Sequence, residues 1–133
     1  MINYLGNVLV TISDRRKAIC NNVDSTLGYN AVVVTANDYY AFGSIMVGRE
    51  YVADTTDNYR FGFNGKETDN ETYGDGNCIA FEERIFDSRL AKYFSTDPRQ
   101  KEYAWQSTYV YFKNSPISNL DLLGGGGPYQ EET

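Results

Sequence analysis

The chain contains no histidine, and this limits the chemistry that its side chains could perform. It has 133 residues, 0 His and 2 Cys. Ser-His-Asp and Cys-His catalysis are excluded, because both use an imidazole as the base. Any catalysis would have to use carboxylates, lysine, tyrosine or a thiol. Three aspartates also have a structural interpretation, since aspartate often caps turns by accepting hydrogen bonds from backbone amides: Asp87, Asp97 and Asp121.

The two cysteines, Cys20 and Cys78, lie far apart and belong to no CxxC motif. Without histidine as a further ligand, they do not indicate a zinc site, and the sequence predicts neither a metal nor a cofactor. They are either two free thiols or one disulfide, and the spacing does not distinguish these alternatives.

The charge is acidic, with 12 Lys+Arg against 18 Asp+Glu and a net charge of −6. This balance argues against a broad contact with nucleic-acid phosphates or an anionic membrane, so we expect no nucleic-acid partner. No apolar run reaches the roughly 18 residues of a membrane-spanning helix, so no membrane insertion is expected. The first residues lack the charged and apolar regions of a signal peptide.

Tyrosine and phenylalanine are abundant, with 12 Tyr and 7 Phe, and such residues favour β-strands. Residues 8–13 alternate in the manner of a strand, and the β-branched run at 30–35 predicts a second one. The polar cluster at 14–17 is expected to end the first strand and begin a loop. Residues 53–58 are expected to form a polar connector.

Beyond residue 59 the pattern changes to short aromatic segments separated by Gly, Asn and Asp. Asn64-Gly65 is a favoured pair for a tight hairpin turn. Residues 78–81 and 84–87 predict two strands, and residues 92–95 should pair back on 84–87. Residues 105–112 fit a helix or a strand equally well. The glycines at 124–127 indicate a flexible break.

Several of these segments together resemble the RHS repeat-associated core domain. Residues 59–67 look like the opening of that domain, and residues 84–98, which end in Asp97-Pro98, resemble its central motif. Residues 109–117, followed by Asp121 and Gly124, resemble its closing elements. Upstream, residues 4–8 and 39–43 look like the last YD-type repeats before the core. The motifs occur in the family's order over most of the chain.

This resemblance implies a fold and an architecture. In the family, YD repeats form a long β-sheet that spirals into a hollow shell, and the core domain ends the wall. We therefore expect a mainly β fold of antiparallel hairpins forming the terminal wall segment, with at most one or two short helices near the C-terminus. The expected divisions are terminal YD-like strands at 1–58, the core at 59–124 and a flexible tail at 125–133. The first strand would need a partner from upstream repeats.

The resemblance also implies a candidate catalytic site. Many relatives have an aspartyl autoprotease at the end of the core, in which two aspartates act together and the chain is cut after a leucine. Asp97 and Asp121 match the two aspartates, and Arg84 and Arg89 would hold the carboxylates in place. The chemistry requires two carboxylates near enough to share a proton, one acting as base and the other as acid.

The closing motif departs from the family pattern at two positions. Leu122 stands where the family has proline, and Gly125 stands where the cleaved leucine would be. These departures put self-cleavage in doubt and predict a degenerate autoprotease. The structural alternative is that the aspartates cap turns and the arginines pair with carboxylates of the wall.

The leading functional expectation is a structural segment of an RHS/YD-repeat shell that encloses or presents a C-terminal toxin or effector. The alternatives are the self-cleavage module and an orphan binding module that pairs by its sheet edges with RHS chains or with itself. The expected partners are the upstream YD-repeat shell, of the same or another chain, and a C-terminal toxin cargo. The full protein would be secreted or displayed at the cell surface, with either an export signal outside this sequence or an unconventional export route.

Overall fold

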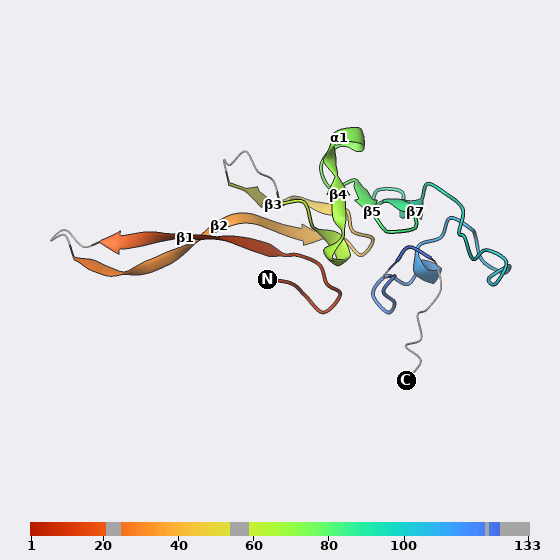
Figure 1. Ribbon diagram of the computed structural model, residues 1–133, viewed down its shortest axis with the longest axis horizontal. Coiled ribbons are helices and arrows are strands. Elements are labelled where there is room, and N and C mark those ends of the chain that lie inside the picture. Colours follow the sequence, from red (N-terminus) through yellow and green to blue (C-terminus); the bar gives the residue numbers. More distant parts are fainter. Residues whose placement is uncertain (21–24, 54–58, 122, 126–133) are drawn as a thin grey trace.

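The computed structural model describes residues 1–20, 25–53, 59–121 and 123–125. The chain is mainly antiparallel β, as predicted, and its strands form a three-stranded and a four-stranded sheet. Figure 1 shows the first sheet reaching away from the rest of the chain as a long ribbon, while the second sheet lies beside its base.

The first sheet has the order β1-β2-β3 and consists of β1 (Val10–Cys20), β2 (Thr26–Tyr39) and β3 (Ile45–Val52). The expected strand end at 14–17 is wrong, because β1 continues to Cys20 and pairs with β2 from Arg16 to Cys20. The polar side chains fit this ribbon because residues 14–20 are exposed there. The ladder slips between Ile12 and Arg16, so the polar cluster marks an irregularity in the strand rather than its end.

The second sheet has the order β4-β5-β6-β7 and is made of short strands. These are β4 (Glu67–Asp69), β5 (Cys78–Ala80), β6 (Ile85–Asp87) and β7 (Lys92–Tyr93). The predicted return of residues 92–95 onto 84–87 is confirmed, since Phe86 pairs with Tyr93 and Asp87 pairs with Lys92. Three short helical segments accompany these strands: η1 (Phe63–Gly65), α1 (Asn70–Tyr73) and η2 (Phe112–Asn114). The residues of η2 all have positive φ, 34°, 58° and 57°, so this segment is a left-handed turn and not the short helix expected near the C-terminus.

The predicted turn at Asn64-Gly65 is also confirmed. Both residues have positive φ, 53° and 66°, as a tight hairpin turn of the favoured type requires. Phe61 and Glu67 pair across it. By contrast, residues 105–112 form neither alternative that the sequence left open. They run as turns, with one bridge between Val110 and Lys92, before η2 begins.

Aromatic side chains of the second sheet and of the segment around η2 form the core. Phe86 and Tyr111 are fully buried, and their ring centroids are 4.6 Å apart. The other members of this core are Phe63, Ile79, Phe81, Tyr93 and Phe112. The long ribbon contributes less to the core. Its contribution comes from Tyr39 and Phe42, which lie at the base of the ribbon and are partly buried against the core.

A chain of hydrogen bonds joins three distant segments at this core. The Asn7 carboxamide oxygen accepts a hydrogen bond from the Asn64 amide at 2.8 Å. The Asn64 side-chain amide donates to the Tyr111 hydroxyl at 2.5 Å. Asn7 is buried despite its polarity, so this bonding satisfies a group that would otherwise destabilise the fold.

The two cysteines are not bonded to each other. Cys20 is exposed at the end of β1, whereas Cys78 is buried in β5. The structure thus selects the free-thiol alternative. None of the helices in the described residues has the length and apolarity needed to cross a membrane.

Candidate carboxylate site

Arg84 lies just before β6 and is almost completely buried, with 3% of its surface exposed. Its Nη2 is 3.5 Å from Oδ2 of Asp97, which is equally buried. This separation makes an ion pair but is too long for a strong hydrogen bond, and Nη2 has no hydrogen-bond partner among the described residues. The pair therefore neutralises the buried carboxylate while leaving one guanidinium nitrogen unsatisfied.

The remaining groups of Arg84 contact three further segments. Its Nε donates a hydrogen bond to the Gly124 carbonyl, and its Nη1 donates to the Thr108 carbonyl at 3.2 Å. The guanidinium carbon lies 3.7 Å from the centroid of the Tyr93 ring, a close cation–π contact. One side chain thus connects β7 with the segments around residues 108 and 124.

Asp121 is fully buried and contacts two of the residues that Arg84 also contacts, Tyr93 and Gly124. Its Oδ1 accepts hydrogen bonds from the amides of Gly124 at 2.7 Å and Leu123 at 3.3 Å. Its Oδ2 accepts a hydrogen bond from the Tyr93 hydroxyl at 2.9 Å. The carboxylate therefore caps its own turn with one oxygen and contacts β7 with the other.

Asp97 divides its oxygens in the same way. Oδ1 accepts a hydrogen bond from the Arg99 amide at 2.7 Å, and Oδ2 faces Arg84. Turn capping, the structural role considered for these aspartates, is thus present at both positions. Through Arg84 and Tyr93 the two carboxylates also belong to one buried group, which we call the carboxylate cluster: Arg84, Tyr93, Asp97 and Asp121.

Tyr93 is the member of the carboxylate cluster that sequence reasoning missed. Burial, followed by the nearby charge of Asp121, raises the pKa of its phenol well above the ordinary value. At neutral pH the phenol is therefore protonated and donates its hydrogen bond to Asp121. The available signal was the position of Tyr93 in the strand 92–95 that was expected to pair with 84–87, which brings its ring next to Arg84.

Arg89, expected to support the catalytic aspartates, has its contacts elsewhere. Its Nη2 is 3.0 Å from Oδ2 of buried Asp87, and its guanidinium lies over the Tyr73 ring. Burial raises the pKa of Asp87, but the hydrogen bonds from Arg89 and from the turn amides outweigh burial and lower it. Arg89 thus stabilises the β6–β7 turn, and its described contacts do not include Asp97 or Asp121.

The carboxylate cluster holds the main chain at Gly124 from both sides, through its N–H on Asp121 and its carbonyl on Arg84. Gly124 and Gly125, the first positions of the expected flexible break, are buried. The rest of the expected tail, like Leu122, lies outside the described residues. Asp121 thus contacts this peptide directly, whereas Asp97 is linked to it through Arg84.

The described residues contain no group of three or more Cys, Asp and Glu side chains placed to hold a metal ion. The carboxylate cluster offers one acid pair with an arginine between its segments.

Solved structures share this fold. The chain is similar to the crystal structure of TcdB2-TccC3-Cdc42, with a TM-score of 0.58 and 18% identity over 82% of this chain and 5% of that chain. It is similar also to the crystal structure of TcdB2-TccC3, with a TM-score of 0.57, 18% identity and the same coverage. No family model matches the sequence, and no curated protein does.

At this identity the similarity shows the fold alone. The matched region is a small part of each TcdB2-TccC3 chain, whereas it covers most of this one. The antiparallel arrangement described here therefore also occurs as a local segment within a much longer polypeptide.

Proposed function

We propose that this chain forms the terminal wall segment of an RHS/YD-repeat shell that encloses or presents a C-terminal toxin. The ordered core motifs support this proposal, and so does the fold shared with a small part of the TcdB2-TccC3 chains. In this proposal the upstream YD-repeat wall is the partner, and the whole protein acts outside the cell or at its surface.

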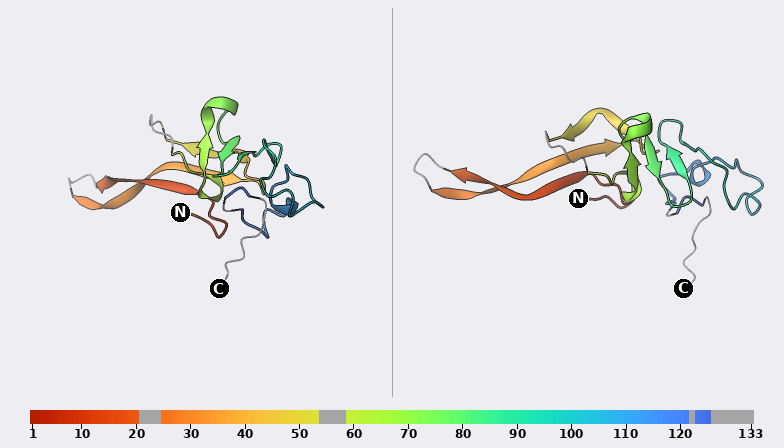
Figure 2. Two further views of the ribbon diagram at one scale, coloured as in Figure 1. Left: turned by 45° about the vertical axis from the view of Figure 1, so that its right-hand side comes forward. Right: turned by 45° about the horizontal axis from the view of Figure 1, so that its top comes forward.

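The observation that carries the proposal is the open first sheet. β1 and β3 are its edge strands, and large apolar side chains along it remain exposed, among them Val47 at 92% and Leu27 at 69%. Figure 2 shows in two further views that the β1–β2 hairpin stands clear of the second sheet. An uncovered sheet of this kind is a template for pairing, and neighbouring wall strands would cover it.

The test is to express the complete natural reading frame that contains this sequence and to image the product by electron cryo-microscopy. We expect a hollow β-shell in which the β1–β3 sheet continues the wall and the carboxylate cluster lies at its end. A reading frame without upstream repeats, or a particle in which the β1–β3 sheet has no neighbouring strand, would contradict the proposal.

Self-cleavage is a second candidate, supported by the hydrogen bonds that join Asp121 and Arg84 to Gly124 and by the ion pair between Arg84 and Asp97. The carboxylates would activate water for attack on a peptide bond near residues 121–125. The departures at Leu122 and Gly125 from the family pattern weaken this candidate, and a clasp that only holds the chain end remains the competing role.

Intact mass spectrometry distinguishes the two roles. Cleavage predicts a truncated species that accumulates with time in the native chain and is absent from Asp97→Asn and Asp121→Asn. Asp14→Asn, an exposed position on β1, is the matched control and should behave like the native chain. A single mass corresponding to all residues after prolonged incubation of the native chain would exclude cleavage and leave the clasp.

A further inference from the structure

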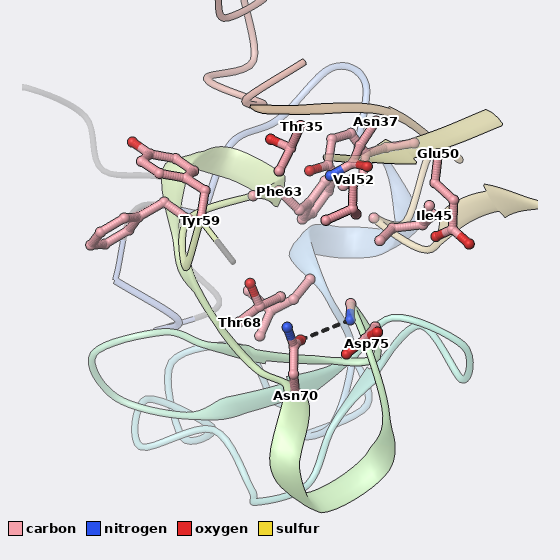
Figure 3. A pocket seen from close by; sticks show the side chains of 16 residues that line it. Thr35, Asn37, Ile45, Glu50, Val52, Tyr59, Phe63, Thr68, Asn70 and Asp75 are labelled. Carbon is pink, nitrogen blue, oxygen red and sulfur yellow. Dashed lines mark hydrogen bonds between the residues drawn. The ribbon is translucent and has the colours of Figure 1, made fainter. Parts of the chain in front are cut away.

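A narrow slot separates the two sheets on the side of the molecule formed by β2, β3 and β4. One wall carries Asn37, Glu50 and Val52 from the first sheet, and the other carries Thr68 and Asp75 from β4 and from the turn before β5. Figure 3 shows these two sets of side chains facing each other across the opening. None of the residues that line the slot belongs to the carboxylate cluster.

Close contacts at two glycines fix the distance between the walls. A Cβ built on Gly43 would lie 2.6 Å from the Phe63 ring, and one built on Gly76 would lie 2.5 Å from Ile45. The sheets are therefore in van der Waals contact on either side of the slot. These contacts set the width of the space between the two sheets.

Glu50 and Asp75 are the two acids that line the slot. Six carboxylates form ion pairs with lysine or arginine: Asp38, Glu67, Glu82, Glu83, Asp87 and Asp97. Within the described residues, Glu50 and Asp75 form no such pair, although both line the slot. Two carboxylates from opposite walls that lack a cation create a site of negative potential.

The other end of the slot is aromatic. Figure 3 places Tyr59 away from Glu50 and Asp75, with the Phe63 ring on the upper wall between them. Phe61 stands next to Tyr59, with ring centroids 5.8 Å apart. Aromatic faces attract organic cations, and their edges pack on alkyl chains.

The dimensions of the slot limit the size of an occupant. Water-sized atoms can occupy about 50 Å³ of it. Since one such atom needs about 10–15 Å³ on this measure, the slot takes about three to five atoms. That volume suits a slender alkyl stem with a terminal ammonium, and it is too small for a sugar ring.

We propose that this slot binds an alkylammonium group of the lysine type, with the ammonium between Glu50 and Asp75 and the stem lying toward Phe61 and Tyr59. The same chemistry is offered by a free aliphatic amine and by a lysine side chain of another polypeptide. The slot is separate from the carboxylate cluster, so this binding goes beyond the proposed function and does not depend on it.

The test is an NMR titration of the ¹⁵N-labelled chain with butylammonium, in which the amides of Asn70 and Gly76 report on the slot. The Gly76 backbone amide donates a hydrogen bond of 3.0 Å to the side-chain oxygen of Asn70, beside Asp75. We expect saturable shifts confined to the slot, and Kd weakened at least tenfold in Glu50→Gln/Asp75→Asn. Both positions are exposed, so this variant should retain the native spectrum elsewhere.

Glu71→Gln/Glu102→Gln is the control variant, because it removes two exposed acids outside the slot. It should bind butylammonium within twofold of the native chain. Equal binding of neutral butanol, equal Kd in both variants, or shifts that potassium chloride reproduces would overturn the proposal.

A blocked pentapeptide, acetyl-Gly-Gly-Lys-Gly-Gly-amide, separates the two sources. Tighter binding of the peptide than of butylammonium supports a lysine carried on a polypeptide. Weaker binding of the peptide supports a free amine. Failure of both probes to shift the slot amides would overturn the site itself.

Discussion

At the scale of single residues, the carboxylate cluster depends most on Arg84. This side chain pairs with Asp97, donates to the carbonyls of Thr108 and Gly124, and covers the Tyr93 ring. A buried carboxylate that loses its cation cannot be rehydrated without opening the fold. Exposed ion pairs lack this dependence, because water replaces the lost partner.

We therefore expect Arg84→Met to lower the free energy of unfolding by about 3–5 kcal/mol, since it leaves buried Asp97 without a counter-charge. Arg60→Met is the matched control. It removes the partner of Glu67 in an exposed pair and should cost less than about 1 kcal/mol. Urea titrations followed by tyrosine fluorescence measure both values. Similar losses for the two variants would mean that burial of the Arg84 pair has no energetic consequence.

The buried phenols predict a loss of stability in alkaline solution. Burial raises the pKa of Tyr93 and of Tyr111 above the ordinary value of 10.0. Below about pH 10 the folded and the unfolded states both keep the phenolic protons. Above it the unfolded state loses them while the folded state does not, so stability falls by about 1.4 kcal/mol per pH unit for each tyrosine. Burial likewise raises the pKa of Cys78 from 9.0, which begins the decline earlier.

Tyr93→Phe provides the control for this pH dependence. It should weaken the fold by about 1.5–3 kcal/mol at neutral pH, because Oδ2 of Asp121 loses a donor. Above pH 10 the free energy of unfolding of this variant should fall less steeply than that of the native chain. The two slopes should differ by about 1.4 kcal/mol per pH unit, because one titrating tyrosine is lost. Denaturant titrations between pH 8 and 11 measure the two slopes, and parallel slopes would contradict the assignment.

The sequence led to three members of the carboxylate cluster because the family motif includes them. Asp97, Asp121 and Arg84 were identified by their positions in a motif, and the structure brings them together in a buried cluster. The motif did not indicate the contribution of the Tyr93 hydroxyl. Arg89 was assigned to the same site, but the β6–β7 turn places Arg89 two residues after Asp87, where a local pair forms first. Local geometry of this kind is not visible in a motif.

At the scale of elements, the contact between the two sheets depends on small residues. Gly43 follows β2 with φ of 87° and lies against the Phe63 ring, so a side chain there is disfavoured by both backbone and space. Gly28, within β2, has no heavy atom within 4 Å of a built Cβ. Gly28 pairs with Ile19 in the β1–β2 hairpin, whereas Gly43 lies in the turn between β2 and β3.

Gly43→Ala should lower the free energy of unfolding by about 2–4 kcal/mol, from overpacking against Phe63 and from the strained φ. Gly28→Ala should leave stability unchanged or raise it by about 0.5–1 kcal/mol, because alanine loses less chain entropy in a strand. Thermal denaturation by circular dichroism compares them. If the two variants melt together, Gly43 does not form the close contact described here.

Elements with local signals were predictable. The Asn64-Gly65 turn and the return of residues 92–95 follow from turn residues and alternation within a few positions. The length of β1 was not predictable in this way, because β2 supplies hydrogen bonds to a polar stretch that would otherwise be a loop. Residues 105–112 take their conformation from the core around Tyr111, so their own periodicity was uninformative.

At the scale of the whole molecule, the exposed sheet edges predict association. β3 is an edge strand, and Val47 on it is almost fully exposed. An exposed edge of this kind is a template for pairing with another chain.

We expect the native chain to self-associate at tens of micromolar, and Val47→Lys to shift it toward monomer. Leu90→Lys is the matched control, because it places the same charge on an exposed apolar position in the β6–β7 turn, away from the edge. Size-exclusion chromatography with light scattering gives the masses. A monomeric native chain would contradict the expectation, and equal effects of the two variants would show that association is not specific to the β3 edge.

The hydrogen bonds from Asn7 through Asn64 to Tyr111 have a kinetic consequence. They close loops of more than forty residues on each side, so the chain must lose much of its freedom before this junction can form. Refolding should therefore be slow for a chain of this size, with a rate limited by the search that brings three remote segments together. Synthesis from the N-terminus would add to the delay, because Asn7 emerges from the ribosome long before Tyr111 is made.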